Sequence, residues 1–159
     1  MSSVTRLIHD LAARHGARPA LIDMAWDATT GGFRRGASIS YADLYDRTLR
    51  LVDALAARGV RPGDRVAVLL DNSVELVVSE WACLVSGMVW VALNVRSSPS
   101  EQTAILRDCA ASVLIVSSRY RRVVDLATLG DSCTIVEVGA GGDWDRLLAS
   151  GAPRLPAQE

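Results

Sequence analysis

A cluster of glycines at residues 139–142 is the first candidate for chemistry in this sequence. Glycine-rich turns that open a helix can bind phosphate through free backbone N–H groups. In dinucleotide-binding folds such a turn directly follows the first strand. Here residues 71–73, after the first long apolar run, contain no glycine, and the cluster follows the last predicted strand. A flexible loop is therefore the simpler interpretation, with phosphate binding as the alternative.

Side chains that act as nucleophiles or bases do not form a recognisable group. All 17 basic residues are arginine, which excludes a Schiff-base lysine and a phosphate-loop lysine. No G-x-S-x-G turn is present for a hydrolase serine. The carboxylate pairs Asp143/Asp145 and Glu75/Glu80 are explained more simply by helix capping and solvation. We predict no catalytic, cofactor-binding or metal-binding residue in this chain.

Basic residues form two small clusters, at residues 34–35 and 119–122. A solvated surface is the simpler interpretation of each, and anion binding is the alternative. The formal net charge of the 159 residues is −1, so no basic face is available for nucleic acid or for an anionic membrane. We predict neither partner. Trp81 and Trp90 lie in apolar segments and are expected to pack in the core.

Cysteine and histidine positions argue against metal binding and disulfides. Cys83, Cys109 and Cys133 are far apart in apolar surroundings, which predicts reduced thiols and a cytoplasmic location. His9 and His15 have no nearby cysteine and are expected to be solvated.

Targeting and membrane segments are not evident. The N-terminus lacks the apolar core of a secretory signal. Residues 74–93 are strongly apolar, but acidic residues and Gly87 interrupt them, so a helix, a turn and a strand are expected there.

Hydrophobic periodicity and turn residues predict the elements that position these groups. A loop or loose hairpin is expected over residues 25–36. Ser40, Asn72 and Ser98 are predicted helix caps, paired with acidic residues three positions later. The predicted helices span residues 4–15, 41–58, 73–86, 99–110, 120–129 and 144–148. The predicted strands span residues 20–22, 37–40, 66–70, 88–93, 112–116 and 134–138.

Helices and strands alternate from residue 41 to residue 138, which is typical of a parallel sheet. The predicted fold class is α/β, with a layered, mainly parallel sheet flanked by helices and a small N-terminal strand or hairpin element. Residues 1–150 are expected to form one domain, and residues 151–159 a tail or linker.

Three ordered segments resemble the N-terminal region of adenylate-forming enzymes, also called the AMP-binding superfamily. The first runs from Ile39-Ser-Tyr-Ala-Asp-Leu44 to Arg61-Pro-Gly-Asp-Arg-Val-Ala-Val68, and the second is Leu70-Asp-Asn-Ser-Val-Glu-Leu76. The third runs from Leu84 through Asn94-Val-Arg96 and Ser98-Pro-Ser-Glu101 to the strand Val113-Leu-Ile-Val116. The Asn-x-Arg ending is more similar to acyl-CoA synthetases and ligases than to peptide-synthetase domains.

The resemblance implies an enzyme that activates a carboxylate with ATP and Mg and transfers the acyl group to a thiol such as coenzyme A. It also implies that the phosphate loop, the adenine and ribose motifs and the catalytic lysine lie beyond this sequence. The chain is therefore expected to be an inactive N-terminal fragment whose partner is the remainder of the parent enzyme. Its exposed apolar surface is expected to cause self-association.

Two other functions stay open on the sequence alone. One is a freestanding, non-catalytic α/β module that binds a partner protein. The other is an unrelated flavodoxin-like nucleotide-binding domain, with its ligand at the carboxyl ends of the strands, near residues 71–73, 94–97 and 117–119.

Overall fold

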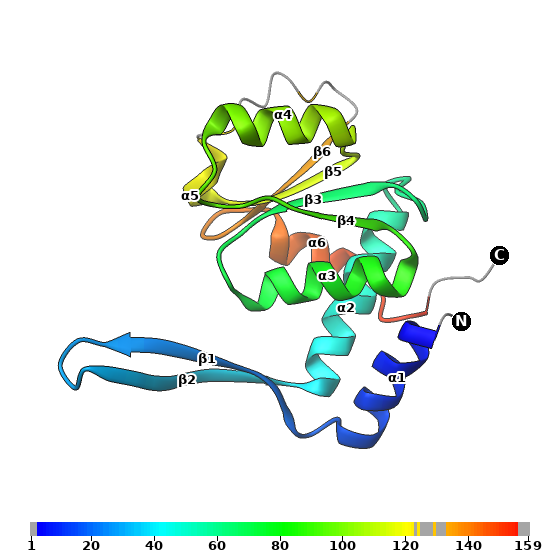
Figure 1. Cartoon of the computed structure of the whole chain (residues 1–159). Helices are drawn as coiled ribbons and strands as arrows, with labels where there is room; N and C mark the ends of the chain where they lie inside the picture. Colours follow the sequence, from blue (N-terminus) through cyan, green and yellow to red (C-terminus); the bar gives the residue numbers. More distant parts are fainter. Residues whose placement is uncertain (1–2, 123, 125–128, 130–132, 156–159) are drawn as a thin grey trace.

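The computed structural model describes residues 3–122, 124, 129 and 133–155. An antiparallel hairpin, β1–β2, precedes a four-stranded parallel sheet with the strand order β4-β3-β5-β6 (Figure 1). The helices are α1 (Ser3–His15), α2 (Tyr41–Ala56), α3 (Val74–Ser86), α4 (Pro99–Cys109), α5 (Ser118–Arg121) and α6 (Trp144–Ser150). The strands are β1 (Pro19–Asp27), β2 (Gly32–Ser40), β3 (Arg65–Leu69), β4 (Val89–Ala92), β5 (Val113–Ser117) and β6 (Thr134–Val138).

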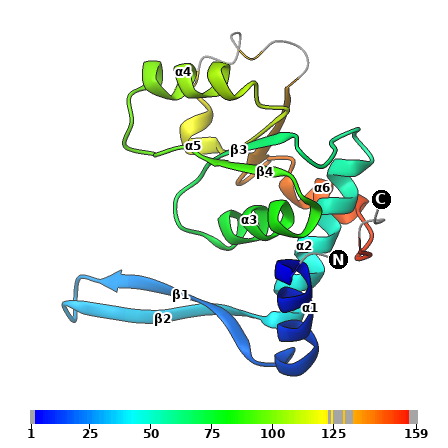
Figure 2. The same ribbon diagram turned by 45° about the vertical axis from the view of Figure 1, so that its right-hand side comes forward.

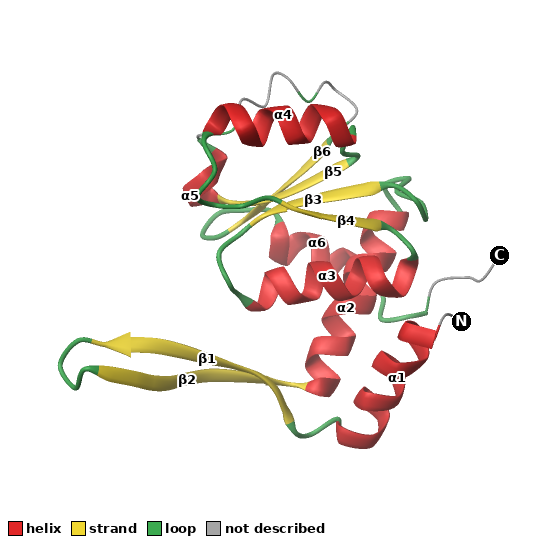
Figure 3. Cartoon of the chain, in the orientation of Figure 1, coloured by secondary structure: helices red, strands yellow, loops and turns green. Residues whose placement is uncertain are grey.

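Helices cover both faces of the parallel sheet, as Figure 3 shows. Helices α2, α3 and α6 lie on one face, and α4 lies on the other. Helix α1 packs against α2 and α3 through the buried Ile8, Leu49 and Val85. The predicted α/β class with a parallel sheet and an N-terminal hairpin is confirmed.

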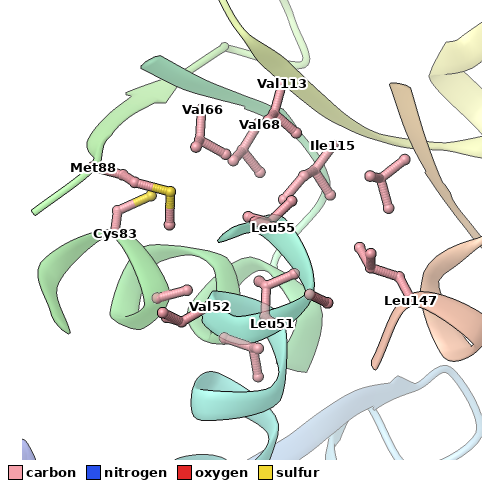
Figure 4. Close-up of a cluster of buried hydrophobic side chains, with 14 of the residues drawn as sticks. Leu51, Val52, Leu55, Val66, Val68, Cys83, Met88, Val113, Ile115 and Leu147 are labelled. Carbon is pink, nitrogen blue, oxygen red and sulfur yellow. The ribbon is translucent and has the colours of Figure 1, made fainter. Parts of the chain in front are cut away.

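The larger core lies between the sheet and α2. Leu51 and Leu55 of α2 are completely buried against Val66 of β3 and Val113 of β5 (Figure 4). Burial of one such aliphatic side chain contributes about 1.5–3 kcal/mol relative to exposure. The continuous apolar run of β3 follows from this burial, because every second residue of the strand faces each helix layer.

Side-chain capping fixes where three of the helices begin. Ser40 and Ser98 cap α2 and α4 as predicted, and Ser98 forms a full capping box with Glu101. The prediction of Asn72 as the cap of α3 is wrong. Ser73 is the cap, because its hydroxyl reaches the N–H of Leu76 three residues later, at 3.2 Å.

The hairpin is longer than predicted. Residues 25–36 contain parts of both strands, and the pairing extends to the tip at Asp27 and Gly32. The sequence signal fails there because the hairpin projects from the body, so neither face has the alternating buried positions that mark a strand (Figure 2).

Two further predicted elements differ from the structure or extend beyond the described residues. The strand predicted at residues 88–93 is β4, which lies at the edge of the sheet with Val89 46% exposed, while Met88 and Leu93 beside it are buried. Half of the predicted helix over residues 120–129 lies outside the described residues; α5 ends at Arg121. Within the described chain, no helix has the length and apolarity needed to cross a membrane.

The segment after α6 contacts α2. Asp53 accepts hydrogen bonds from the Ala152 N–H at 2.9 Å and the Arg154 Nε at 2.6 Å. Arg50 donates to the Gly151 carbonyl at 3.0 Å. A Cβ at Gly151 would lie 2.0 Å from the Arg50 carbonyl oxygen, so this close approach requires glycine. The domain boundary proposed at residue 150 stays a prediction.

Substituting Gly151→Ala should therefore destabilise the chain by about 1–3 kcal/mol, the usual cost of overpacking a rigid contact. The backbone at Gly151 is extended, so the cost is steric and not conformational. Gly32→Ala is the matched control, because a Cβ there has no neighbour closer than 4.0 Å. Urea unfolding of the two variants measures the difference, and equal midpoints would contradict the prediction.

Candidate functional site

The carboxyl edge of the parallel sheet is the part of the fold where ligands bind in open α/β sheets. Residues 71–73 follow β3, residues 94–97 follow β4, and residues 117–119 end β5 and begin α5. Strands β4, β3 and β5 are neighbours, so the topology places the three predicted segments along one edge. We describe each segment in turn.

Asp71 joins the loop after β3 to α5. Its carboxylate accepts a hydrogen bond from the Tyr120 hydroxyl at 2.8 Å and lies 3.6 Å from the Arg119 guanidinium. The same guanidinium lies 5.2 Å from the centre of the Tyr120 ring. The hydrogen bond to Asp71 raises the pKa of Tyr120, because it stabilises the protonated phenol. These three groups therefore form one exposed, mutually paired cluster.

Hydrogen bonds from the Gln102 side chain support the loop at residues 94–97. This buried side chain donates from its Nε2 to the carbonyls of Asn94 and Ser97, each at 3.2 Å. The Asn94 side chain accepts from the Arg96 N–H at 2.9 Å. Hydrogen bonds from the Ser98 backbone and hydroxyl lower the pKa of Glu101. These hydrogen bonds hold the loop in its observed geometry.

The glycine cluster after β6 does not match a phosphate cradle. The Gly142 N–H donates to the Gly139 carbonyl at 2.9 Å, and the Asp143 N–H donates to the Glu137 carbonyl at 2.8 Å. A Cβ at Gly142 would lie 2.3 Å from the Glu137 carbonyl oxygen. Glycine is needed here for close backbone packing, and these two N–H groups are already used. The sequence also has no lysine, so this chain contains no lysine-bearing phosphate loop.

Several of the other candidate groups have partners elsewhere or are buried. Arg121 pairs with Glu137 at 3.8 Å, and Asp143 pairs with Arg146. Burial raises the pKa of the Cys83 thiol to about 12, which makes it a poor nucleophile. His9 lies 3.2 Å from the Tyr45 hydroxyl. Among the residues with described positions, no group of three or more His, Cys, Asp or Glu side chains is placed to hold a metal ion.

The sequence predicted the segments of this edge but not their pairing. Asp71 and Tyr120 are 49 positions apart, so only the neighbouring positions of β3 and β5 bring them together. The predicted basic cluster at residues 119–122 is split, because Arg119 turns to Asp71 and Arg121 to Glu137. The role of Gln102 was also missed, although its place in the first turn of a capped helix was visible.

Solved structures define the class of this fold. The chain superposes with a TM-score of 0.82 on the anthranilate CoA ligase AuaEII, at 21% identity, covering 99% of this chain and 29% of that one. It superposes with a TM-score of 0.76 on the N-terminal domain of FACL13 from Mycobacterium tuberculosis, at 27% identity, covering 100% of this chain and 38% of that one. The fold is that of the N-terminal domains of adenylate-forming CoA ligases.

The chain belongs to the AMP-binding enzyme family, whose profile matches residues 8–155. It is 40% identical over 95 residues to feruloyl-CoA synthase from Amycolatopsis sp, covering 60% of this chain and 19% of the relative. It is 41% identical over 83 residues to 3-hydroxybenzoate–CoA/4-hydroxybenzoate–CoA ligase from Thauera aromatica, covering 52% of this chain and 16% of the relative. The chain thus matches less than a fifth of the length of these two relatives, and its predicted resemblance to acyl-CoA ligases is confirmed.

The Asp71–Tyr120 hydrogen bond can be tested through the pKa of Tyr120, which absorbance spectroscopy reports. Asp71→Asn should lower the pKa of Tyr120 toward its ordinary value, because the amide no longer offers a charged acceptor to the phenol. Alkaline difference absorbance measures tyrosinate formation, and Tyr120→Phe identifies the band. The pKa of Tyr45, which burial raises, should stay unchanged as an internal control. An unmoved Tyr120 titration in Asp71→Asn would rule out this contact.

Proposed function

We propose that the chain is the N-terminal part of an ATP-dependent acid–thiol ligase of the acyl-CoA synthetase type. The observation that carries the proposal is the family match over residues 8–155, together with superposition of the whole chain on an N-terminal domain of FACL13. The relatives include feruloyl-CoA synthase and a hydroxybenzoate–CoA ligase. This similarity supports a carboxylic acid as the substrate and coenzyme A as the acceptor. The similar proteins include ligases for aromatic acids and for fatty acids, so we propose only that the substrate is a carboxylic acid.

Within such an enzyme, this chain is proposed to act as scaffold. At its carboxyl edge Asp71 pairs with Tyr120, and its glycine turn uses two N–H groups internally. ATP would supply the adenylate that activates the carboxylate, while the remainder of the parent enzyme would hold ATP, Mg and coenzyme A. We therefore expect the 159-residue chain to be inactive alone.

The alternative is a non-catalytic interaction module. The exposed apolar side chains of the β1–β2 hairpin favour it, because large apolar residues on a projecting element mark contact surfaces. The alternative predicts binding of a protein partner with no link to adenylate formation.

Pyrophosphate exchange tests the proposed function. The 159-residue chain should give no carboxylate-dependent exchange of labelled pyrophosphate into ATP, because the groups that would hold the triphosphate are absent from its sheet edge. A gene product that continues past Glu159 into the rest of the enzyme should give exchange with at least one acid from an aromatic and fatty acid panel.

Two outcomes would contradict the proposal in different ways. Exchange catalysed by the 159-residue chain alone would refute the scaffold role. A longer gene product that lacks exchange with every acid, and lacks a Ser/Thr/Gly-rich loop with a lysine, would refute the ligase assignment.

A further inference from the structure

A five-residue segment after α6, residues 151–155, lies against α2 and forms no helix or strand. We call it the strap; it is the last coloured part of the chain in Figure 1. The Ala152 N–H donates to one carboxylate oxygen of Asp53 at 2.9 Å, and the Arg154 Nε donates to the other at 2.6 Å. One side chain of α2 therefore holds two separate points of the strap.

The charge of Asp53 strengthens both of these contacts. The hydrogen bond from Arg154, and after it the one from the Ala152 N–H, lowers the pKa of Asp53 below its ordinary value. The carboxyl group is therefore ionised at neutral pH, and hydrogen bonds to an ionised acceptor are stronger than neutral ones. The Asp53 side chain is only 18% exposed, whereas that of Arg154 is 73% exposed. Asp53 is thus the fixed partner and Arg154 the mobile one.

Apolar contacts add to the strap but do not bury it. A hollow of about 300 Å³ beside the first half of α2 has Pro153 in its wall, and one of about 470 Å³ beside the second half has Leu155 in its wall. Leu49, Val52 and Ala56 line these hollows at helical spacing and form one stripe along α2. Leu155 stays 44% exposed, so its burial is incomplete and the polar contacts carry more of the attachment.

The two ends of the strap differ in how firmly the body holds them. Gly151 is buried against the backbone of Arg50, and its carbonyl accepts a hydrogen bond from the Arg50 side chain at 3.0 Å. Residues 152–155 are all exposed. Release of the Asp53 contacts would therefore free residues 152–155 and leave Gly151 in place as the hinge.

We propose that the strap is a latch, which Asp53 locks onto α2 to fix the point at which the chain leaves the domain. In the closed latch, residues 152–155 follow α2. In the open latch, the residue that follows them can move by up to about 14 Å, the extended length of four residues. In a gene product that continues past Glu159, the latch would set where the next segment begins relative to the sheet.

Amide hydrogen exchange of the 159-residue chain measures opening of the latch at the Ala152 N–H. Asp53→Asn keeps the size of the side chain but removes its charge and one of its two acceptor oxygens. Exchange at Ala152 should therefore become about tenfold faster or more. The N–H of Ile115 is the internal reference, because Ile115 is completely buried in the central strand β5 and reports global unfolding. Its exchange should stay unchanged.

Trypsin supplies a second measurement, because it takes the arginine side chain of its substrate into a pocket. Arg154 is not free to enter that pocket while it is bound to Asp53. Asp53→Asn should therefore speed cleavage after Arg154 about tenfold, which mass spectrometry follows as loss of residues 155–159. Asp108→Asn is the matched control, since it makes the same chemical change at an exposed position of α4, on the opposite face of the sheet.

Three results would overturn the proposal. The first is unchanged exchange at Ala152 and unchanged cleavage after Arg154 in Asp53→Asn. The second is an equal effect of Asp108→Asn. The third is equally faster exchange at Ile115, because the strap would then open only when the whole chain unfolds. None of these readouts involves ATP, so the outcome is independent of the proposed ligase activity.

Discussion

Burial of the central strands on both faces is the constraint on which the rest of the structure depends. In β3 and β5, Val66 and Ile115 face the larger core, while Ala67 and Leu114 face α4, and all four are almost completely buried. A sheet with two buried faces needs helices on each side, and parallel strands provide them through their crossovers. The two helix layers and the polar loops at the ends of the strands follow from this requirement.

The same constraint explains why the carboxyl edge is polar yet paired. Strands that are apolar throughout must place their polar residues in the loops at their ends. At this edge the loops come within reach of one another, so Asp71 pairs with Tyr120, and Gln102 supports the loop after β4. A loop that binds its own neighbours is well ordered but has few free groups to offer a nucleotide. A supporting role for the chain fits this chemistry better than a nucleotide site.

Local signals in the sequence predicted those parts of the fold that local physics determines. The Ser98 capping box, the left-handed Gly87 that ends α3, and the turn with Gly63 at positive φ were all predictable within a few residues. The choice between Asn72 and Ser73 was not, because both side chains can cap and only backbone geometry decides. Contacts between distant segments, such as Asp71 with Tyr120 or Gly151 with Arg50, depend on strand order and helix position, which a single sequence does not specify.

The hairpin departs from the pattern of the rest of the chain in a way that bears on function. In the body, the large apolar residues lie mostly inside, and at the sheet edge Arg119 pairs with Asp71 and Arg121 with Glu137. On the hairpin, Trp26 and Phe33 are exposed, and Arg34 and Arg35 have no ion-pair partner among the described residues. Exposed apolar area and unpaired charge both represent free energy that association can recover. The exposed aromatic pair Trp26 and Phe33 therefore lies on the hairpin, away from the sheet edge where a nucleotide-binding fold would have its ligand.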